Sequence, residues 1–148
     1  MCTHAESVGL KAQHATLEQA QLMQREACGR PVVLIVEDEI LLRWTIVSVI
    51  DETGFNASEA GSGVEAISIL ERRNDVWAVV TDVQMPGPID GLRLAHLISI
   101  RWPKVKVIVT SGRLRLREDD VPAGVRCLHK PYDPSQLIGI LDEWATNE

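Results

Sequence analysis

The fold is decided by the stretch VVLIVEDE at residues 32–39, in which five apolar residues lead directly into three acids. A short and wholly apolar run is typical of a parallel strand that is buried on both faces of its sheet. Three further runs also end in polar or charged residues, at 77–80, at 105–109 and, more weakly, at 125–128. The carboxyl ends of parallel strands share one edge, where open α/β sheets bind ligands. We therefore expect the residues that follow these runs to meet there.

The segments between the runs predict helices, so strands and helices alternate along the chain. Such alternation predicts a parallel sheet with helices on both faces and right-handed crossovers. An additional strand is expected at 55–60, and Pro86, Gly87 and Pro88 predict an irregular turn at 85–90. The expected helices lie at about 40–53, 63–72, 91–102 and 134–145.

Particular residue types mark where two of these helices begin. Ser62 and Asp133 are candidate N-caps, because their side-chain oxygens can accept hydrogen bonds from the first helical turn, and Pro134 suits the first helical position. One more helix must lie between residues 114 and 121 to connect the last two strands. Its signal is poor, because leucine and arginine alternate over 114–117 and Pro122 follows.

Composition limits the classes of function. The formal net charge is −6, and three acids directly follow the one basic cluster, at 113–117, which argues against a nucleic-acid partner. No apolar stretch approaches the roughly 18 residues of a membrane span, and the polar first 30 residues argue against a signal peptide. We therefore expect a cytoplasmic protein without a membrane partner, in which the three scattered cysteines stay reduced.

Residues 1–30 differ in composition from the rest and are interpreted as an extension that precedes one domain at 31–148. A helix is predicted at 16–27, with Leu17, Ala20 and Met23 on one side. An isolated helix of this length is marginal in water. We therefore expect it to pack on its own domain or on a second copy of the chain, which would make a homodimer.

Glu37, Asp38 and Asp82 are predicted to form a cluster of carboxylates at the shared edge of the sheet. Neighbouring carboxylates repel one another, and a hard divalent cation such as Mg²⁺ would remove that conflict. The alternative is that Asp38 or Glu39 only caps the helix that follows, because acids are common where a strand leads into a helix.

Two further residues favour a functional site at this edge. Thr110 ends a strand, where its hydroxyl can donate to an anion, and Lys130 precedes Pro131, which favours an extended lysine backbone. Each has an ordinary alternative: a threonine that suits a strand, and a lysine in a surface loop. The chemistry that fits the whole set is phosphoryl transfer to a carboxylate, with Asp82 as the nucleophile.

Four motifs, in this order, resemble the receiver domain of two-component response regulators. The resemblance covers about residues 31–145. It implies a flavodoxin-like α/β fold, with five parallel strands in the order 2-1-3-4-5. The motifs are VVLIVEDE (32–39), TDVQMPGPIDG (81–91), VIVTSG (107–112) and KPY (130–132).

The resemblance also implies a function and a role for each site residue. Asp82 would accept a phosphoryl group from a phosphohistidine of a sensor histidine kinase or a phosphotransfer protein, as in a phosphorelay. Asp38 matches the direct Mg²⁺ ligand, Glu37 the water-mediated one and the backbone carbonyl of Gln84 a third. The chain would assist its own Mg²⁺-dependent phosphorylation and dephosphorylation, without being an enzyme for other substrates. It ends 18 residues after Lys130, so a single-domain regulator is expected, with output through a partner protein.

Three features depart from the pattern of the family. One additional residue falls within 87–89, so the loop after Asp82 is expected to bulge. Cys127 occupies the position of a Tyr or Phe that usually swings inward on phosphorylation. The weak helix at 114–121 belongs to the usual output face of the family, so the geometry of signalling is expected to differ.

Two other classes of function stay open. A receiver-like binding module that signals without phosphorylation is favoured by Cys127, but it is opposed by the complete set of acids, threonine and lysine. A hydrolase of the haloacid dehalogenase type uses a similar aspartate nucleophile. That class carries a second acid two residues later, where this chain has Gln84.

Overall fold

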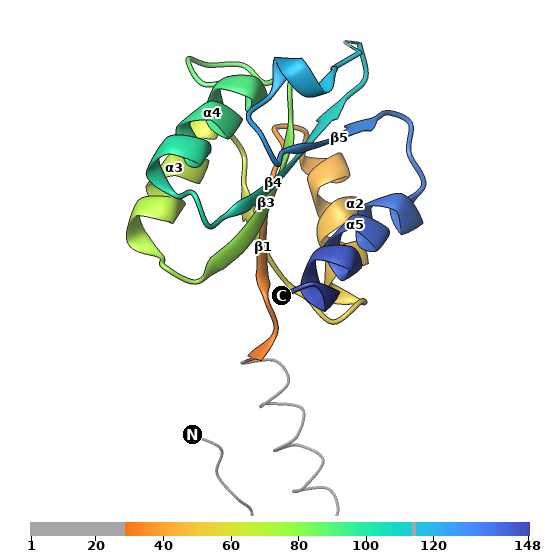
Figure 1. The fold of residues 1–148 in the computed structure, drawn as a ribbon. Coiled ribbons are helices and arrows are strands. Elements are labelled where there is room, and N and C mark those ends of the chain that lie inside the picture. The colour runs from red at the N-terminus through yellow and green to blue at the C-terminus, as the bar shows by residue number, and fades with distance from the viewer. Residues whose placement is uncertain (1–28, 114) are drawn as a thin grey trace, which may run out of the picture. The chain divides into compact units, whose positions relative to one another are not determined.

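Five strands pair in one parallel sheet, in the order β2-β1-β3-β4-β5 (Figure 1). The computed structural model describes residues 29–113 and 115–148, so the helix predicted at 16–27 lies outside the described residues. We describe the unit formed by Pro31–Glu148 by itself. The observed strand order confirms the predicted flavodoxin-like fold. The strands are β1 (Val32–Val36), β2 (Asn56–Ala60), β3 (Val76–Asp82), β4 (Lys106–Ser111) and β5 (Arg126–His129).

Four α-helices cover the sheet, two on each face. In Figure 1 the sheet is seen edge-on, with α3 and α4 on one side of it and α2 and α5 on the other. Among the described helices, none has both the length and the hydropathy that crossing a bilayer requires. The helices are α2 (Ile40–Asp51), α3 (Gly63–Arg72), α4 (Gly91–Arg101) and α5 (Pro134–Thr146).

Each face of the sheet has its own hydrophobic core. In β1, Val33 and Ile35 belong to the core under α2 and α5, whereas Leu34 and Val36 belong to the core under α3 and α4. Successive side chains of a strand point to opposite faces, so a strand between two helical layers must be apolar at every position. This requirement explains the unbroken apolar run at the start of the domain.

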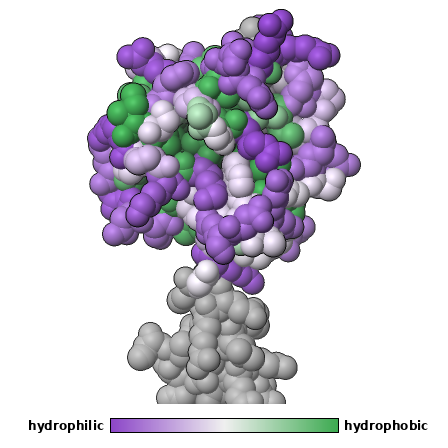
Figure 2. Space-filling view, in the orientation of Figure 1, coloured by the Kyte–Doolittle hydropathy of each residue, from purple (hydrophilic) through white to green (hydrophobic). Residues whose placement is uncertain are grey.

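Polar residues cover the outer surface and mark the helix ends. The visible face is mostly hydrophilic, with hydrophobic side chains showing between polar ones (Figure 2).

The predicted N-caps are confirmed: the side chain of Ser62 accepts from the N–H of Glu65, and that of Asp133 from the N–H of Ser135. Glu39 occupies the N-cap position of α2, but its side chain makes no capping hydrogen bond. The alternative that Glu39 caps this helix through its side chain is therefore wrong.

The described residues 115–121 do not form the helix that is expected between residues 114 and 121. Within the described part of that segment, the helical residues are one 3₁₀ turn, η1 (Glu118–Asp120). Leu116 packs against the core under α3 and α4, and the carboxylate of Asp120 accepts from the N–H of Arg117. Alternating leucine and arginine cannot give a helix one continuous apolar side. An irregular segment, followed by a 3₁₀ turn, is the outcome.

Candidate functional site

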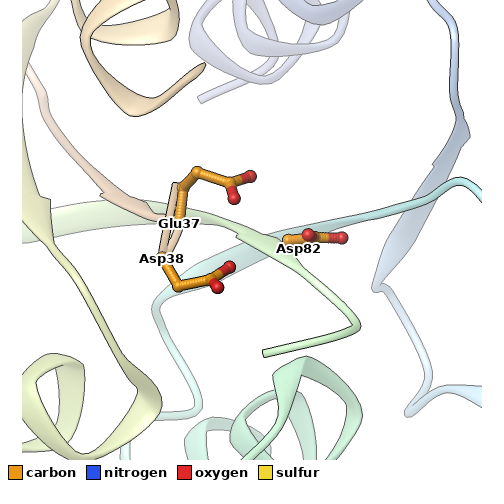
Figure 3. Close-up of side chains that lie close together, drawn as sticks. All are labelled: Glu37, Asp38 and Asp82. Carbon is orange, nitrogen blue, oxygen red and sulfur yellow. The ribbon is translucent and has the colours of Figure 1, made fainter. Parts of the chain in front are cut away.

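Glu37, Asp38 and Asp82 lie together at the carboxyl edge of the sheet (Figure 3). One carboxylate oxygen of each residue lies within 4.8 Å of the others. The two acids after β1 extend toward the side on which Asp82 lies, at the end of β3. Because β1 and β3 are neighbours in the sheet, acids at their ends must meet. The predicted acidic cluster is therefore present.

Glu37 is the buried member of this cluster, with a side chain that is 4% exposed. Burial raises the pKa of Glu37. The main-chain N–H of Glu39, which donates to this carboxylate, opposes the rise, and the charge of Asp82 adds to it. A buried acid beside two others is a charge conflict that a bound cation would remove. The donor set therefore fits a divalent ion such as Mg²⁺, which Glu37, Asp38 and Asp82 would hold.

Lys130 reaches the acids from the far side of β4. Its Nζ atom lies 3.4 Å from Oδ2 of Asp82 and 3.7 Å from Oε1 of Glu37. The N–H of Lys130 donates to the carbonyl of Ser111, which fixes the start of the loop after β5. The lysine therefore lies against the acids rather than in a loop away from them, and its role in a functional site stays a prediction.

Thr110 is the direct neighbour of Asp82 across the β3–β4 pair. Its side chain is buried, and its hydroxyl donates to the carbonyl of Thr81 over 3.4 Å. A hydrogen bond of this length is weak, so an anion at the sheet edge could replace its acceptor. Gln84 lies in the irregular segment after β3, and its role as a carbonyl ligand stays a prediction.

Arg43 is a site residue that the sequence analysis missed. Its guanidinium donates to the main-chain oxygen of Glu37 over 2.8 Å and pairs with Glu59 of β2 over 2.9 Å. Its position in the sequence could have indicated this contact, because a side chain one turn into a helix can reach back to the residues before the helix.

Tyr132, of the KPY motif, lies close enough to the acids to feel their charge. Burial raises the pKa of Tyr132 to about 12, and the charges of Glu37 and Asp82 add to that rise. The ring packs against the core under α2 and α5. Tyr132 is thus on the opposite face of the sheet from α3 and α4, where Leu116 packs.

Cys127 is partly buried on β5 and pairs in register with Val109 of β4. Burial raises the pKa of its thiol, and the charges of Asp120 and Glu118 add to the rise. The thiol lies beside a hollow of about 130 Å³ that Leu116 also lines. A small side chain therefore lies at the position where receiver domains usually carry a Tyr or Phe.

Comparison with known proteins places this chain in one family. The family model for the response regulator receiver domain matches residues 33–142. The chain is 33% identical over 113 residues to an NtrX-like response regulator of Rickettsia conorii, covering 74% of this chain and 24% of that protein. It is 36% identical over 122 residues to the sensor kinase CckA of Brucella abortus, covering 78% of this chain and 12% of that protein. The chain thus spans about a quarter or less of the length of these relatives.

Solved structures agree with the sequence matches. A response regulator receiver protein from Pseudomonas putida superposes with a TM-score of 0.70 at 29% identity, covering 78% of this chain and 98% of that one. A second, from Sinorhizobium medicae, gives a TM-score of 0.73 at 26% identity, covering 78% of this chain and 94% of that one.

Proposed function

Because this chain belongs to the family of response regulator receiver domains, we propose that it accepts a phosphoryl group on Asp82. The donor would be a phosphohistidine of a sensor histidine kinase or a phosphotransfer protein, and the output would pass to a partner protein. The observation that carries this proposal is the approach of Lys130 to Asp82, at 3.4 Å, inside a cluster of three acids. A nucleophilic carboxylate with a fixed cation beside it suits transfer of an anionic group.

The transfer would be a displacement at phosphorus. An oxygen of the ionised Asp82 carboxylate would form the new P–O bond while the P–N bond of the phosphohistidine breaks. The imidazole would keep the electron pair of that bond and take up a proton. Lys130 would neutralise part of the charge on the transferred group, and the hydroxyl of Thr110 would donate to one of its oxygens. Mg²⁺, when bound by the acids, would supply further neutralisation of the phosphoryl oxygens.

The surface beside the acids suits a protein donor. α2 begins directly after Glu39, and its first turns expose the large apolar side chains of Ile40, Leu41 and Trp44. A separate apolar groove of about 430 Å³ lies between α2 and α5 and is lined by other residues of α2 and by Lys130 and Tyr132. Several large apolar side chains exposed together are typical of an interaction site. A protein that brings a histidine to Asp82 must lie on this edge, so we assign the surface to the phosphodonor.

Intact-mass analysis tests the proposal. The protein is incubated with Mg²⁺ and a small phosphodonor such as acetyl phosphate, and one added phosphoryl group is expected. Asp82→Asn should abolish the addition, whereas Asp142→Asn, at an exposed position of α5, should leave it intact. Equal labelling of the two variants would rule out Asp82 as the acceptor. An unlabelled wild-type protein would favour the other reading, a binding module that signals without phosphorylation.

A further inference from the structure

Arg43 joins three segments at the acidic edge of the sheet. It belongs to α2, its Nη1 atom donates to the main-chain oxygen of Glu37 just beyond β1, and its Nε atom pairs with Oε1 of Glu59 on β2. The side chain of Arg43 is 16% exposed, although Glu59 is 43% exposed. The guanidinium is therefore largely withdrawn from water and held between defined partners, unlike the usual surface ion pair.

The place that the guanidinium occupies is shaped by β2 and the residue that follows it. A Cβ atom at Gly61 would lie 3.0 Å from Nη1 of Arg43, so a larger residue there would press on the guanidinium. The N–H of Gly61 donates to the carboxylate of Glu65, at 2.7 Å. Glu59 therefore supplies the negative charge that pairs with the guanidinium, and the missing side chain of Gly61 leaves room for it.

The hydrogen bond from Arg43 completes the fixation of Glu37. The N–H of Glu37 donates to the carbonyl of Ala60, and its carboxylate accepts from the N–H of Glu39. With Arg43 on its carbonyl oxygen, the peptide groups before and after Glu37 are both held. The second of these is the Glu37–Asp38 peptide, and because a peptide is planar, fixing its oxygen also limits where Asp38 can point.

This fixation matters because the three carboxylates oppose their own arrangement. Their oxygens converge within 4.8 Å, and Lys130 approaches only Glu37 and Asp82. Without a cation, repulsion would turn Asp38 away from the other two acids. We propose that Arg43 is a positioning residue of the cation site, which holds the Glu37–Asp38 peptide so that both acids face Asp82 before the ion arrives. The inference rests on the proposed function, in which this site binds Mg²⁺.

Equilibrium binding of Mg²⁺, measured by calorimetry on the full chain, tests this role. Arg43→Met should weaken Mg²⁺ binding by roughly 10-fold or more, the usual effect of losing a group that orients a metal ligand. The Mg²⁺ affinity of Arg43→Lys should lie between those of the wild type and Arg43→Met, because an ammonium cannot donate in two fixed directions as a guanidinium does. Loss of a positive charge beside acids would by itself tighten Mg²⁺ binding. Weakening therefore reports positioning, and tightening or no change would overturn it.

Two further variants separate this role from a structural one. Arg73→Met removes the exposed pairing of an arginine with Asp75, away from the acids. It should have little effect on stability and leave Mg²⁺ binding unchanged. Glu59→Met should weaken binding less than Arg43→Met does and should have no further effect in the Arg43→Met background, because Glu59 acts through Arg43. If Arg43→Met does not fold, the Mg²⁺ affinities of Arg43→Lys and Glu59→Met test the positioning role. Unchanged Mg²⁺ binding in both variants would overturn it.

The wild-type protein distinguishes failure of this inference from failure of the proposed function. Wild-type protein that binds Mg²⁺ and is labelled on Asp82, together with an Arg43→Met variant that binds Mg²⁺ equally well, would overturn the positioning role alone. Wild-type protein that neither binds Mg²⁺ nor becomes labelled would overturn the proposed function, and this inference with it.

Discussion

Gly91 lies so close to the carbonyl group of Asp82 that no side chain fits between them. A Cβ atom at Gly91 would overlap the carbonyl oxygen of Asp82 and lie 2.7 Å from its carbonyl carbon. The N–H of Gly91 donates to the carbonyl of Val83, at 2.9 Å. The first residue of α4 therefore packs on the main chain that carries the proposed phosphoacceptor, where no flexible side chain can move aside.

Gly91→Ala should push the end of β3 away from α4. We expect a loss of about 1–3 kcal/mol in the free energy of unfolding, as for other substitutions that overfill a packed site. We also expect phosphorylation of Asp82 to slow by roughly 10-fold or more, because small displacements of a reacting group are costly. Urea denaturation and the rate of mass labelling measure the two effects.

Gly139→Ala is the matched control, because Gly139 lies exposed on α5 with no atom within 4 Å of its added Cβ. Alanine is the better helix former, so a gain of about 0.5–1 kcal/mol is expected, with unchanged labelling. Similar behaviour of the two variants would contradict the tight contact at Asp82.

Much of the fold could be predicted because its physical causes are local. The run from Val32 to Val36 is apolar throughout because helices cover both faces of β1. The meeting of Glu37 with Asp82 then follows from topology, since the strands that carry them are neighbours. Lys130 follows β5, two strands away from β3, and reaches Asp82 because its side chain is long.

The parts that could not be predicted depend on tertiary contacts. The place for Arg43 is made by Glu59 and Gly61, which precede and follow the end of β2, and nothing near Arg43 in the sequence marks it. The segment around Leu116 is decided by competition between a weak helix and one good core contact. Periodicity identified the weakness of that helix, but it could not identify what would replace it.

Asp38→Asn should have opposite effects with and without Mg²⁺. Without divalent cations, removing one of three converging carboxylates relieves repulsion, so the variant should be more stable than the wild type by up to about 1 kcal/mol. With Mg²⁺, the wild type should gain stability and the variant little, because a ligand has been lost. Urea denaturation in EDTA and in Mg²⁺ measures both. A variant that is less stable than the wild type in EDTA would refute the repulsion on which this prediction rests.

Tyr132→Phe should make the protein more resistant to alkali. The pKa of Tyr132 is raised to about 12 in the folded protein, against about 10 when unfolded. Because the folded pKa is the higher one, the stability linked to this hydroxyl is complete below pH ~10 and is lost as pH rises toward 12. The variant escapes that loss, so its free energy of unfolding should fall less over this range, by about 1–2 kcal/mol.

Tyr132 is the one tyrosine of the sequence, so the absorbance of tyrosinate reports its ionisation directly. Tyr132 should ionise at a clearly higher pH in the folded protein than in urea, where its pKa is expected near 10. Ionisation of the folded protein near pH ~10 would show that Tyr132 is less buried than described.

The segment between β4 and β5 has few anchors. In its described part, Leu116, Val121 and Val125 are the buried or partly buried apolar residues, and the turn of η1 is held by the carboxylate of Asp120. It follows Thr110, whose hydroxyl is held only by a long bond to Thr81. Segments with few buried contacts open at low free-energy cost, so this one should respond first to a new charge at Asp82.

Phosphorylation should therefore be read out by this segment without an aromatic ring at position 127. A phosphoryl group adds about −1.5 to −2 charges, and the hydroxyl of Thr110 can turn from Thr81 to meet it. We expect hydrogen exchange to change across residues 110–121 when a phosphoryl mimic such as beryllium fluoride binds. The change should persist in Cys127→Ala, because that side chain is small in either case. In Leu116→Ala, exchange should be faster even without the mimic, because one of the few apolar anchors is gone. Changes confined to residues 126–130, or lost in Cys127→Ala, would show instead that Cys127 is the switch.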